Sequence, residues 1–126
     1  MREDKHMINF PQDFLWGTST SGPQTEGRFT GDGKGDNLWD YWYQVEPHRF
    51  RFQEGPGLTS TFYENWEEDI ELLVETGHTA FRTSIQWSRI FPKGRGEVNP
   101  VGVAFYRQVF ERIKSKGIHL MVNLYH

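Results

Sequence analysis

Of the two arginines between positions 78 and 92, Arg82 stands in a run of mostly apolar and hydroxylated residues. The run is typical of a short strand after a helix, where a full positive charge is costly to bury unless a carboxylate meets it. An acidic group should therefore lie opposite Arg82. No Asp or Glu of this sequence is an obvious candidate, and the chain stops at Tyr125-His126, within a predicted strand. We expect this chain to be the front part of an enzyme whose catalytic carboxylates lie further along.

The strand that carries Arg82 is predicted to alternate between two faces. One face carries Phe81, Thr83 and Ile85, and the other face carries Ala80, Arg82 and Ser84. If the bulky face meets the helices, Arg82 points into a barrel or a cleft.

A helix is predicted immediately before this strand, over Thr61–Thr76. Thr61 and Glu64 form a predicted capping box, and Gly77 supplies the stop. The apolar stripe of this helix consists of Phe62, Trp66, Ile70 and Leu73.

A second helix is predicted to begin at Asn99-Pro100, an N-cap followed by proline, and to end at Gly117. Its apolar stripe consists of Val103, Tyr106, Val109, Phe110 and Ile113.

Two further strands complete the pattern. Phe14–Thr18 is a short apolar run that suits a buried strand, and Ile118–Tyr125 is nearly continuous in its apolar character, as in strands buried on both faces of a parallel sheet. Strands that alternate with helices through short connections predict an α/β fold. An open sheet and a (β/α)8 barrel are the two choices.

A long stretch rich in glycine and aromatic residues, positions 27–57, separates the first strand from the first helix. A connection of this length is usually functional, and we expect a short helix around Leu38–Tyr43. Asp32 and Asp36 lack the spacing of a calcium loop and are interpreted as parts of a solvated turn.

Composition excludes several partners and groups. The 14 Lys and Arg against 17 Asp and Glu give a net charge of −3, with scattered basic residues, so we expect no nucleic-acid partner. No apolar stretch is long enough for a membrane helix, and the charged start is unlike a secretory leader, so we expect a cytoplasmic protein without a membrane partner. Residues 1–9 are expected to form a disordered or extended tail before one domain over 10–126. No metal or cofactor is implied.

Aromatic residues make up 16% of the chain and include five Trp. Such a content is typical either of an aromatic core or of surfaces on which sugar rings pack. We interpret the tryptophans mainly as core residues, namely Trp16, Trp39, Trp42, Trp66 and Trp87.

Three ordered motifs carry a resemblance to a known family. Phe14-Leu15-Trp16-Gly17 is followed by Gln24-Thr25-Glu26-Gly27, and the run from Phe81 to Pro92 reads Phe-Arg-Thr-Ser-Ile-Gln-Trp-Ser-Arg-Ile-Phe-Pro. These resemble the opening strand, the Gln-x-Glu-Gly element and the Arg-Phe-Ser-Ile-x-Trp-Ser-Arg-Ile-x-Pro signature of family 1 glycoside hydrolases, with Thr83 where Phe is more usual. Asn99, Tyr106 and Leu124-Tyr125-His126 fall in step with the same pattern, and the resemblance covers nearly everything from residue 10 to 126.

The resemblance implies a (β/α)8 barrel to which this chain supplies about the first three βα units. Gln24, Arg82 and His126 would then emerge at the carboxyl ends of the strands, where such barrels have their active sites. By analogy, Gln24 would hold two neighbouring sugar hydroxyls and His126 one more, while Arg82 would support the nucleophilic glutamate and keep it ionised. Without the resemblance, Gln24 would rather satisfy loop backbone groups and His126 would be a core residue.

The implied chemistry is retaining hydrolysis of β-glycosides, which needs two carboxyl groups about 5–5.5 Å apart. The family carries them in an Asn-Glu-Pro and a later Glu-Asn-Gly motif, and neither occurs in this sequence. Glu26 is interpreted as a packed structural carboxylate, Arg89 as a structural pairing residue, and Glu67-Glu68-Asp69 as a solvated helix face. We expect no catalytic residue in this chain and no activity from it alone.

Within the family, Ser19–Phe29 together with Gly31–Asn37 looks most like bacterial 6-phospho-β-glucosidases. The expected partner is therefore a β-linked phospho-glucoside or glucoside, and the sequence leaves a homo-oligomer open. A plain β-glucosidase and a 6-phospho-β-galactosidase are the alternatives. A non-catalytic, truncated barrel is the alternative of another class, and its open strand edges would favour association.

Overall fold

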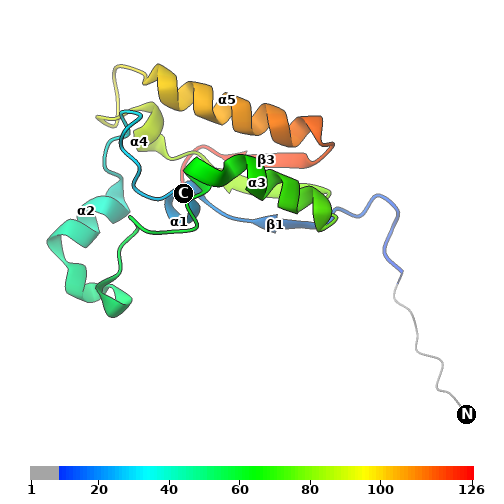
Figure 1. Cartoon of the computed structure of the whole chain (residues 1–126), viewed down its shortest axis with the longest axis horizontal. Helices are drawn as coiled ribbons and strands as arrows, with labels where there is room; N and C mark the ends of the chain where they lie inside the picture. Colours follow the sequence, from blue (N-terminus) through cyan, green and yellow to red (C-terminus); the bar gives the residue numbers. More distant parts are fainter. Residues whose placement is uncertain (1–8) are drawn as a thin grey trace, which may run out of the picture.

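The computed structural model describes residues 9–126, so the predicted tail, apart from residue 9, lies outside the described residues. The elements along the chain are β1 Gly17–Ser19, α1 Gly22–Thr25, α2 Leu38–Val45, α3 Phe62–Glu75, β2 Ala80–Ser84, α4 Trp87–Ile90, α5 Pro100–Ser115 and β3 His119–Asn123, with short 3-10 turns at Pro47–Arg49 and Arg51–Gln53 (Figure 1). The predicted helices and strands are all present. The first strand begins three residues later than predicted, at Gly17 instead of Phe14.

The three strands form one parallel sheet in the order β1-β2-β3. Gly17 pairs with Ala80 at the start of β1, and Arg82 pairs with Met121 between β2 and β3. A Cβ at Gly17 would lie 2.3 Å from the carbonyl oxygen of Ala80, so the close approach of these two strands requires glycine. Each crossover contains a long helix, α3 before β2 and α5 before β3, which is the predicted α/β alternation.

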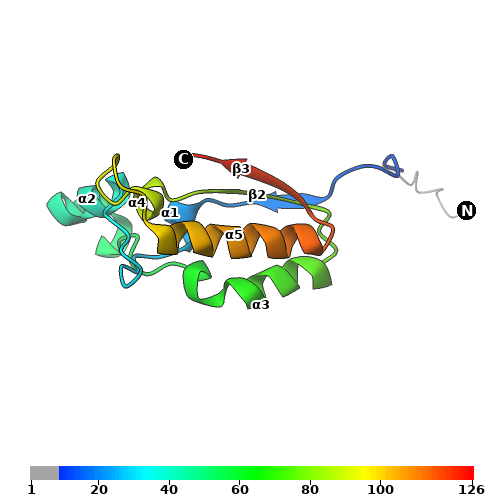
Figure 2. The ribbon, with the colours of Figure 1, turned by 90° about the horizontal axis from the view of Figure 1, so that it is seen from above.

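The core lies between the sheet and the two long helices, which cover the same face (Figure 2). Ile70, Val109 and Ile113 are at most 1% exposed, so the predicted helix stripes do face the sheet. Phe81 meets these helices from β2. The buried cluster consists of Phe62, Ile70, Phe81, Phe105, Tyr106, Val109, Ile113 and Ile118.

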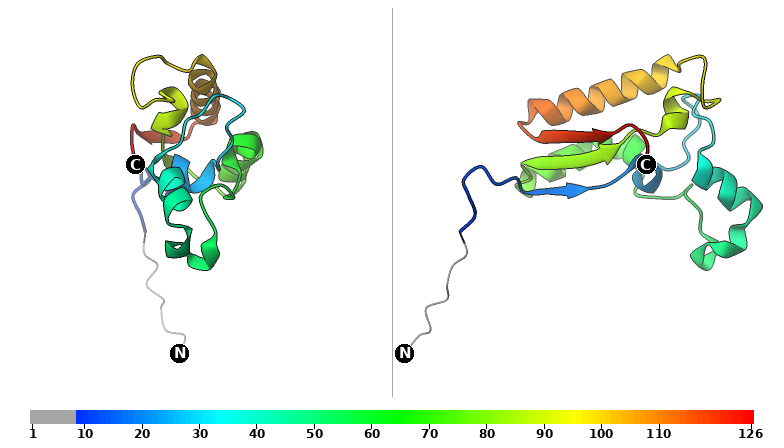
Figure 3. Two further views of the ribbon diagram at one scale, coloured as in Figure 1. Left: turned by 90° about the vertical axis from the view of Figure 1, so that its left-hand side faces the viewer. Right: turned by 180° about the vertical axis from the view of Figure 1, so that it is seen from behind.

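The opposite face of the sheet carries no helix among residues 9–126, as two further views show (Figure 3). Because side chains alternate along β2, Arg82 points to this open face while Phe81 points to the helices. Met121, the neighbour of Arg82 on β3, is 53% exposed, and Leu124 is 67% exposed. The prediction that the last strand is buried on both faces is therefore wrong for the described residues, since only the side toward α5 is covered.

The two long helices differ in how well their starts were predicted. Asn99 caps α5 by accepting a hydrogen bond from the backbone N–H of Val101, with Pro100 in the first turn, as expected. The capping box predicted at α3 is wrong. Thr61 adopts a left-handed conformation with φ 57°, and its hydroxyl donates to the Ser60 carbonyl and accepts from Asn65, so it cannot cap the helix.

The long connection over 27–57 contains the expected helix, α2, which extends two residues further than predicted, to Val45. A capping box that the sequence reasoning missed starts it, since the Asn37 and Asp40 side chains each accept from the other's backbone N–H. α2 and the turns after it protrude beyond the carboxyl ends of the strands (Figure 1). Within residues 9–126, no helix combines the length and apolarity that a membrane crossing requires.

Candidate active site

Arg82 reaches from the open face of β2 toward both neighbouring strands. Its Nε donates to Oδ1 of Asn123 at 3.1 Å, Nη1 donates to the carbonyl oxygen of Thr20 at 3.3 Å, and Nη2 lies 3.5 Å from Nδ1 of His126. None of the ion pairs among residues 9–126 includes Arg82. A guanidinium has five N–H donors, so the group retains donors for an anion in front of the open face.

His126 lies beside Arg82 where the strands end. It is exposed and borders a hollow of about 190 Å³. Other residues around this hollow include Pro23, Asn37, Trp39, Trp87 and Tyr125. Aromatic rings with a few polar groups among them suit a ligand that has apolar faces and hydroxyl groups.

Gln24 lies in α1, the single turn that follows β1, and its side chain is exposed. The buried hydroxyl of Ser21 donates to its Oε1 at 2.7 Å. No hydrogen bond among the described residues joins Gln24 to Arg82 or His126. Its neighbours provide the connection, because Thr20 accepts from Arg82 and Pro23 borders the same hollow as His126. The structure thus brings Arg82 and His126 into contact and leaves Gln24 nearby.

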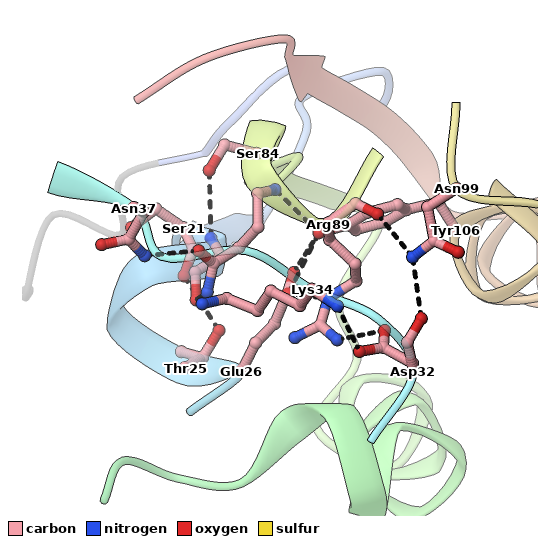
Figure 4. A network of polar contacts seen from close by, with 12 residues as sticks. Ser21, Thr25, Glu26, Asp32, Lys34, Asn37, Ser84, Arg89, Asn99 and Tyr106 are labelled. Atoms are coloured by element: carbon pink, nitrogen blue, oxygen red, sulfur yellow. Dashed lines mark hydrogen bonds and ion pairs between the residues drawn. The ribbon is translucent and has the colours of Figure 1, made fainter. Parts of the chain in front are cut away.

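A separate, buried polar cluster ties the 27–57 connection to Arg89 and Asn99 through Asp32 (Figure 4). Arg89, with no exposed surface, forms ion pairs with Glu26 and with Asp32. Its guanidinium also lies over the Tyr63 ring, 4.0 Å from the centroid, as cations commonly do over aromatic faces. Glu26 accepts a hydrogen bond from the Tyr106 hydroxyl at 2.8 Å. Arg89 is therefore the structural pairing residue, and Glu26 the packed carboxylate, that the sequence predicted.

The protonation states of this cluster follow from burial. Burial raises the pKa of the Glu26 carboxyl, and the nearby Arg89 cation and Tyr106 hydroxyl offset this only in part. Burial, and then the negative charge of Glu26, raise the pKa of Tyr106 well above its ordinary value of 10. Burial alone would lower the pKa of Arg89, but Glu26 and Asp32 outweigh it and raise that pKa. Arg89 therefore stays charged and Tyr106 keeps its proton at neutral pH.

Asp32 departs from the prediction of a solvated turn. It is 8% exposed, pairs with Arg89, and accepts from the backbone N–H of Lys34 at 3.1 Å. Lys34 in turn forms a buried ion pair with Asp40 at 2.7 Å. The prediction is wrong because the cation that buries Asp32, Arg89, comes from a distant part of the chain. Asp36 does lie at the surface, where a hydrogen bond from Gln44 and its pairing with Arg28 lower the pKa of its carboxyl.

The tryptophans are less buried than the sequence reasoning predicted. Trp16, Trp39 and Trp87 are 50%, 44% and 39% exposed, and only Trp66 packs against the core cluster. Trp39 and Trp87 instead border the hollow beside His126. Their interpretation as core residues is wrong for this chain.

Two residues of the site were missed by the sequence reasoning. Asn123 holds Arg82, and its signal was an amide in a strand of mainly apolar residues. Ser21 holds Gln24, and nothing in the sequence distinguishes it from the other small residues around it. Among residues 9–126, no cluster of three or more His, Asp or Glu side chains could hold a metal ion.

Comparison with known proteins defines the class to which this fold and site belong. The chain belongs to glycosyl hydrolase family 1, whose family model matches residues 6–126. The parallel sheet with helices on one face is accordingly part of a (β/α)8 barrel, as in the solved β-glucosidases of this family.

Individual relatives are similar over almost the whole chain. The 6-phospho-beta-glucosidase GmuD of Bacillus subtilis is 51% identical over 117 residues, which is 93% of this chain and 25% of that protein. The aryl-phospho-beta-D-glucosidase BglC of the same organism is 37% identical over 97% of this chain and 25% of its own length. The beta-glucosidase of Thermotoga maritima in complex with castanospermine has a TM-score of 0.88 and 37% identity, over 93% of this chain and 26% of that one. This chain spans about a quarter of the length of these relatives.

Proposed function

We propose that this chain is the N-terminal part of a retaining β-glycosidase whose preferred substrates are 6-phospho-β-glucosides. The observation that carries the proposal is Arg82, a half-buried cation at the carboxyl end of a parallel sheet that no carboxylate of residues 9–126 neutralises. A group of this kind is expected to face an ionised carboxylate. Both catalytic glutamates would come from polypeptide beyond this chain.

In the proposed mechanism Arg82 donates to the nucleophilic glutamate. An opposite charge at contact distance lowers the pKa of a carboxyl, so the glutamate stays ionised and aimed at the anomeric carbon. It attacks to form a glycosyl-enzyme, and the second carboxyl group first protonates the leaving oxygen and then deprotonates the water. Gln24 and His126 would bind hydroxyls of the sugar, and no residue of this chain would take part in a covalent step.

The preference for a phosphorylated sugar is supported by similarity. The relative with 51% identity is named as a 6-phospho-beta-glucosidase, whereas the Thermotoga beta-glucosidase has 37% identity. A plain β-glucosidase is the second candidate, because the Thermotoga structure superposes on this chain with a TM-score of 0.88. A 6-phospho-β-galactosidase is the third. A phosphorylated substrate is formed during uptake, so we propose a cytoplasmic location.

The position of the catalytic glutamates is tested on the gene. Reading the coding sequence past His126 should reveal an Asn-Glu-Pro motif and a later Glu-Asn-Gly motif. A stop codon directly after His126 would favour the non-catalytic barrel, whose exposed strands β1 and β3 would lead to association. Size measurement of the purified protein would then distinguish a defined homo-oligomer from open-ended aggregation.

The substrate class is tested on the complete protein with chromogenic β-glucosides that do or do not carry a 6-phosphate. We expect a much higher kcat/KM for the phosphorylated substrate. Equal kcat/KM values would contradict the phosphate preference and leave plain β-glucosides as the substrate class. When hydrolysis is followed by proton NMR, the sugar released first should be the β-anomer, which means that the anomeric configuration is retained.

A further inference from the structure

Ser21 lies in the tight connection between β1 and α1, next to Gln24. It has no exposed surface, and its hydroxyl lies 2.7 Å from Oε1 of Gln24. A serine hydroxyl has one proton to donate, and the amide oxygen of Gln24 receives it. The Nε2 end of the amide, with both of its N–H donors, is therefore the end that points away from Ser21.

The hydroxyl of Ser21 is not used by the helix that it precedes. Ser21 is the N-cap of α1, where a serine side chain ordinarily accepts from a backbone N–H two or three residues on. It makes no such bond here. Pro23 has no N–H to donate, and the N–H of Gln24 donates to the carbonyl oxygen of Ser21 at 3.1 Å. Among the described residues, the Gln24 side chain is the partner of this hydroxyl.

The connection that carries Ser21 is fixed to β2, the strand of Arg82. The N–H of Gly22 donates to Oγ of Ser84 at 3.0 Å, and Nε2 of Gln86 donates to the carbonyl oxygen of Gly22 at 3.1 Å (Figure 4 shows the Ser84 contact). A Cβ at Gly22 would lie 2.6 Å from Cγ of Gln86, so there is no room for the connection to shift toward α4. Ser21 is thus held in place by the strand at whose end the chemistry is proposed.

We propose that Ser21 is a positioning residue that sets the orientation of the Gln24 amide toward the sugar. With Oε1 held by Ser21, Nε2 donates to one sugar hydroxyl, while the second lone pair of Oε1 accepts from its neighbour. This inference rests on the proposed function, because it assumes that Gln24 binds the sugar. Ser21 itself touches no substrate and acts only through Gln24.

The test is a double-mutant cycle in the complete protein, with Ser21→Ala, Gln24→Ala and both together, assayed on a chromogenic 6-phospho-β-glucoside and the plain β-glucoside. Ser21→Ala should lower kcat/KM by about three- to tenfold, and Gln24→Ala by about 30-fold or more. In the Gln24→Ala background, Ser21→Ala should change kcat/KM by less than about twofold. Ser21→Thr, which keeps the donor, should restore part of the loss.

Ser115→Ala is the control, because the Ser115 hydroxyl also donates one hydrogen bond, to the carbonyl oxygen of Arg112 at 2.7 Å, but lies at the end of α5 that is remote from the carboxyl ends of the strands. Its kcat/KM should stay within about twofold of wild type. Unchanged kcat/KM in Ser21→Ala, or the same loss with and without Gln24, would overturn the role of Ser21. Unchanged kcat/KM in Gln24→Ala would instead contradict the proposed role of Gln24 itself, so the two failures are distinguishable.

Discussion

The guanidinium of Arg82 is held from the next strand by Asn123, whose Oδ1 lies 3.1 Å from Nε. An amide oxygen orients the cation without neutralising it. The positive charge of Arg82 therefore stays available at the open face of the sheet. In the proposed enzyme this charge acts on the nucleophile.

Replacing Arg82 with Met in the complete protein should lower kcat by about 100-fold or more, because a preorganised donor to the reacting group is lost. The acidic limb of the pH profile of kcat/KM should also move to higher pH by about one unit or more. The sign follows because an opposite charge lowers the nucleophile's pKa, and its removal raises that pKa. Arg107→Met is the control, since Arg107 is exposed on α5 and has no ion pair among residues 9–126. An unmoved acidic limb in Arg82→Met would contradict the proposed role.

Asn123→Asp should reduce activity more than Asn123→Ala. The alanine variant removes one contact of the guanidinium and leaves those with Thr20 and His126, so we expect a loss of kcat/KM of about tenfold or less. The aspartate variant has nearly the same shape but places a carboxylate against Arg82, which competes with the nucleophile and raises its pKa by like-charge repulsion. Steady-state kinetics of both variants decide the order. Asp equal to or better than Ala would show that the charge of Arg82 is not the important property.

Arg89→Met should destabilise the protein severely. It leaves Glu26 and Asp32 buried without their cation, and breaking a buried ion pair from one side costs about 3–5 kcal/mol. Arg112→Met removes an exposed partner of Glu71 and should have a far smaller effect. Urea unfolding of the two variants provides the comparison. Similar unfolding midpoints would mean that the buried cluster does not hold the 27–57 connection in place.

The raised pKa of Tyr106 predicts a loss of stability at high pH. A group whose pKa is higher in the folded state stabilises below its unfolded pKa, here about 10, and that contribution is lost as the pH rises through the folded pKa. Tyr106→Phe should cost about 1–3 kcal/mol at neutral pH, because Glu26 and the backbone N–H of Gln86 lose their partner.

The free energy of unfolding of wild type and Tyr106→Phe, measured from pH 7 to 11, isolates this contribution. The difference between them should be constant below about pH 10 and should shrink above it. A difference that grows above pH 10 would mean that the Tyr106 proton is not held in the folded protein.

Local patterns predicted the helices, the strands and their order. The stripe through Ile70 and that through Val109 and Ile113 have helical spacing, and each meets the sheet as expected. Arg82 was recognised for a similar reason, because a charge among apolar neighbours is visible within one strand.

What the sequence could not predict depends on contacts between distant residues. Asp32 lies in a glycine-rich stretch and looked solvated, but Arg89, 57 positions away, buries it. Thr61 has the spacing of a capping box, yet its backbone is left-handed and its hydroxyl bonds the Ser60 carbonyl and the Asn65 side chain instead of a backbone N–H of the helix. The hydrogen bond between Ser21 and Gln24 is local, but the sequence does not reveal that Ser84 of β2 fixes the turn that carries both residues.

The most direct test of the central claim is a crystal structure of the complete protein. We predict that the guanidinium of Arg82 lies on the open face of β2, within about 3 Å of a glutamate carboxylate supplied by polypeptide beyond His126. A structure in which Arg82 contacts only water, or pairs with a carboxylate that is remote from the bound sugar, would contradict it.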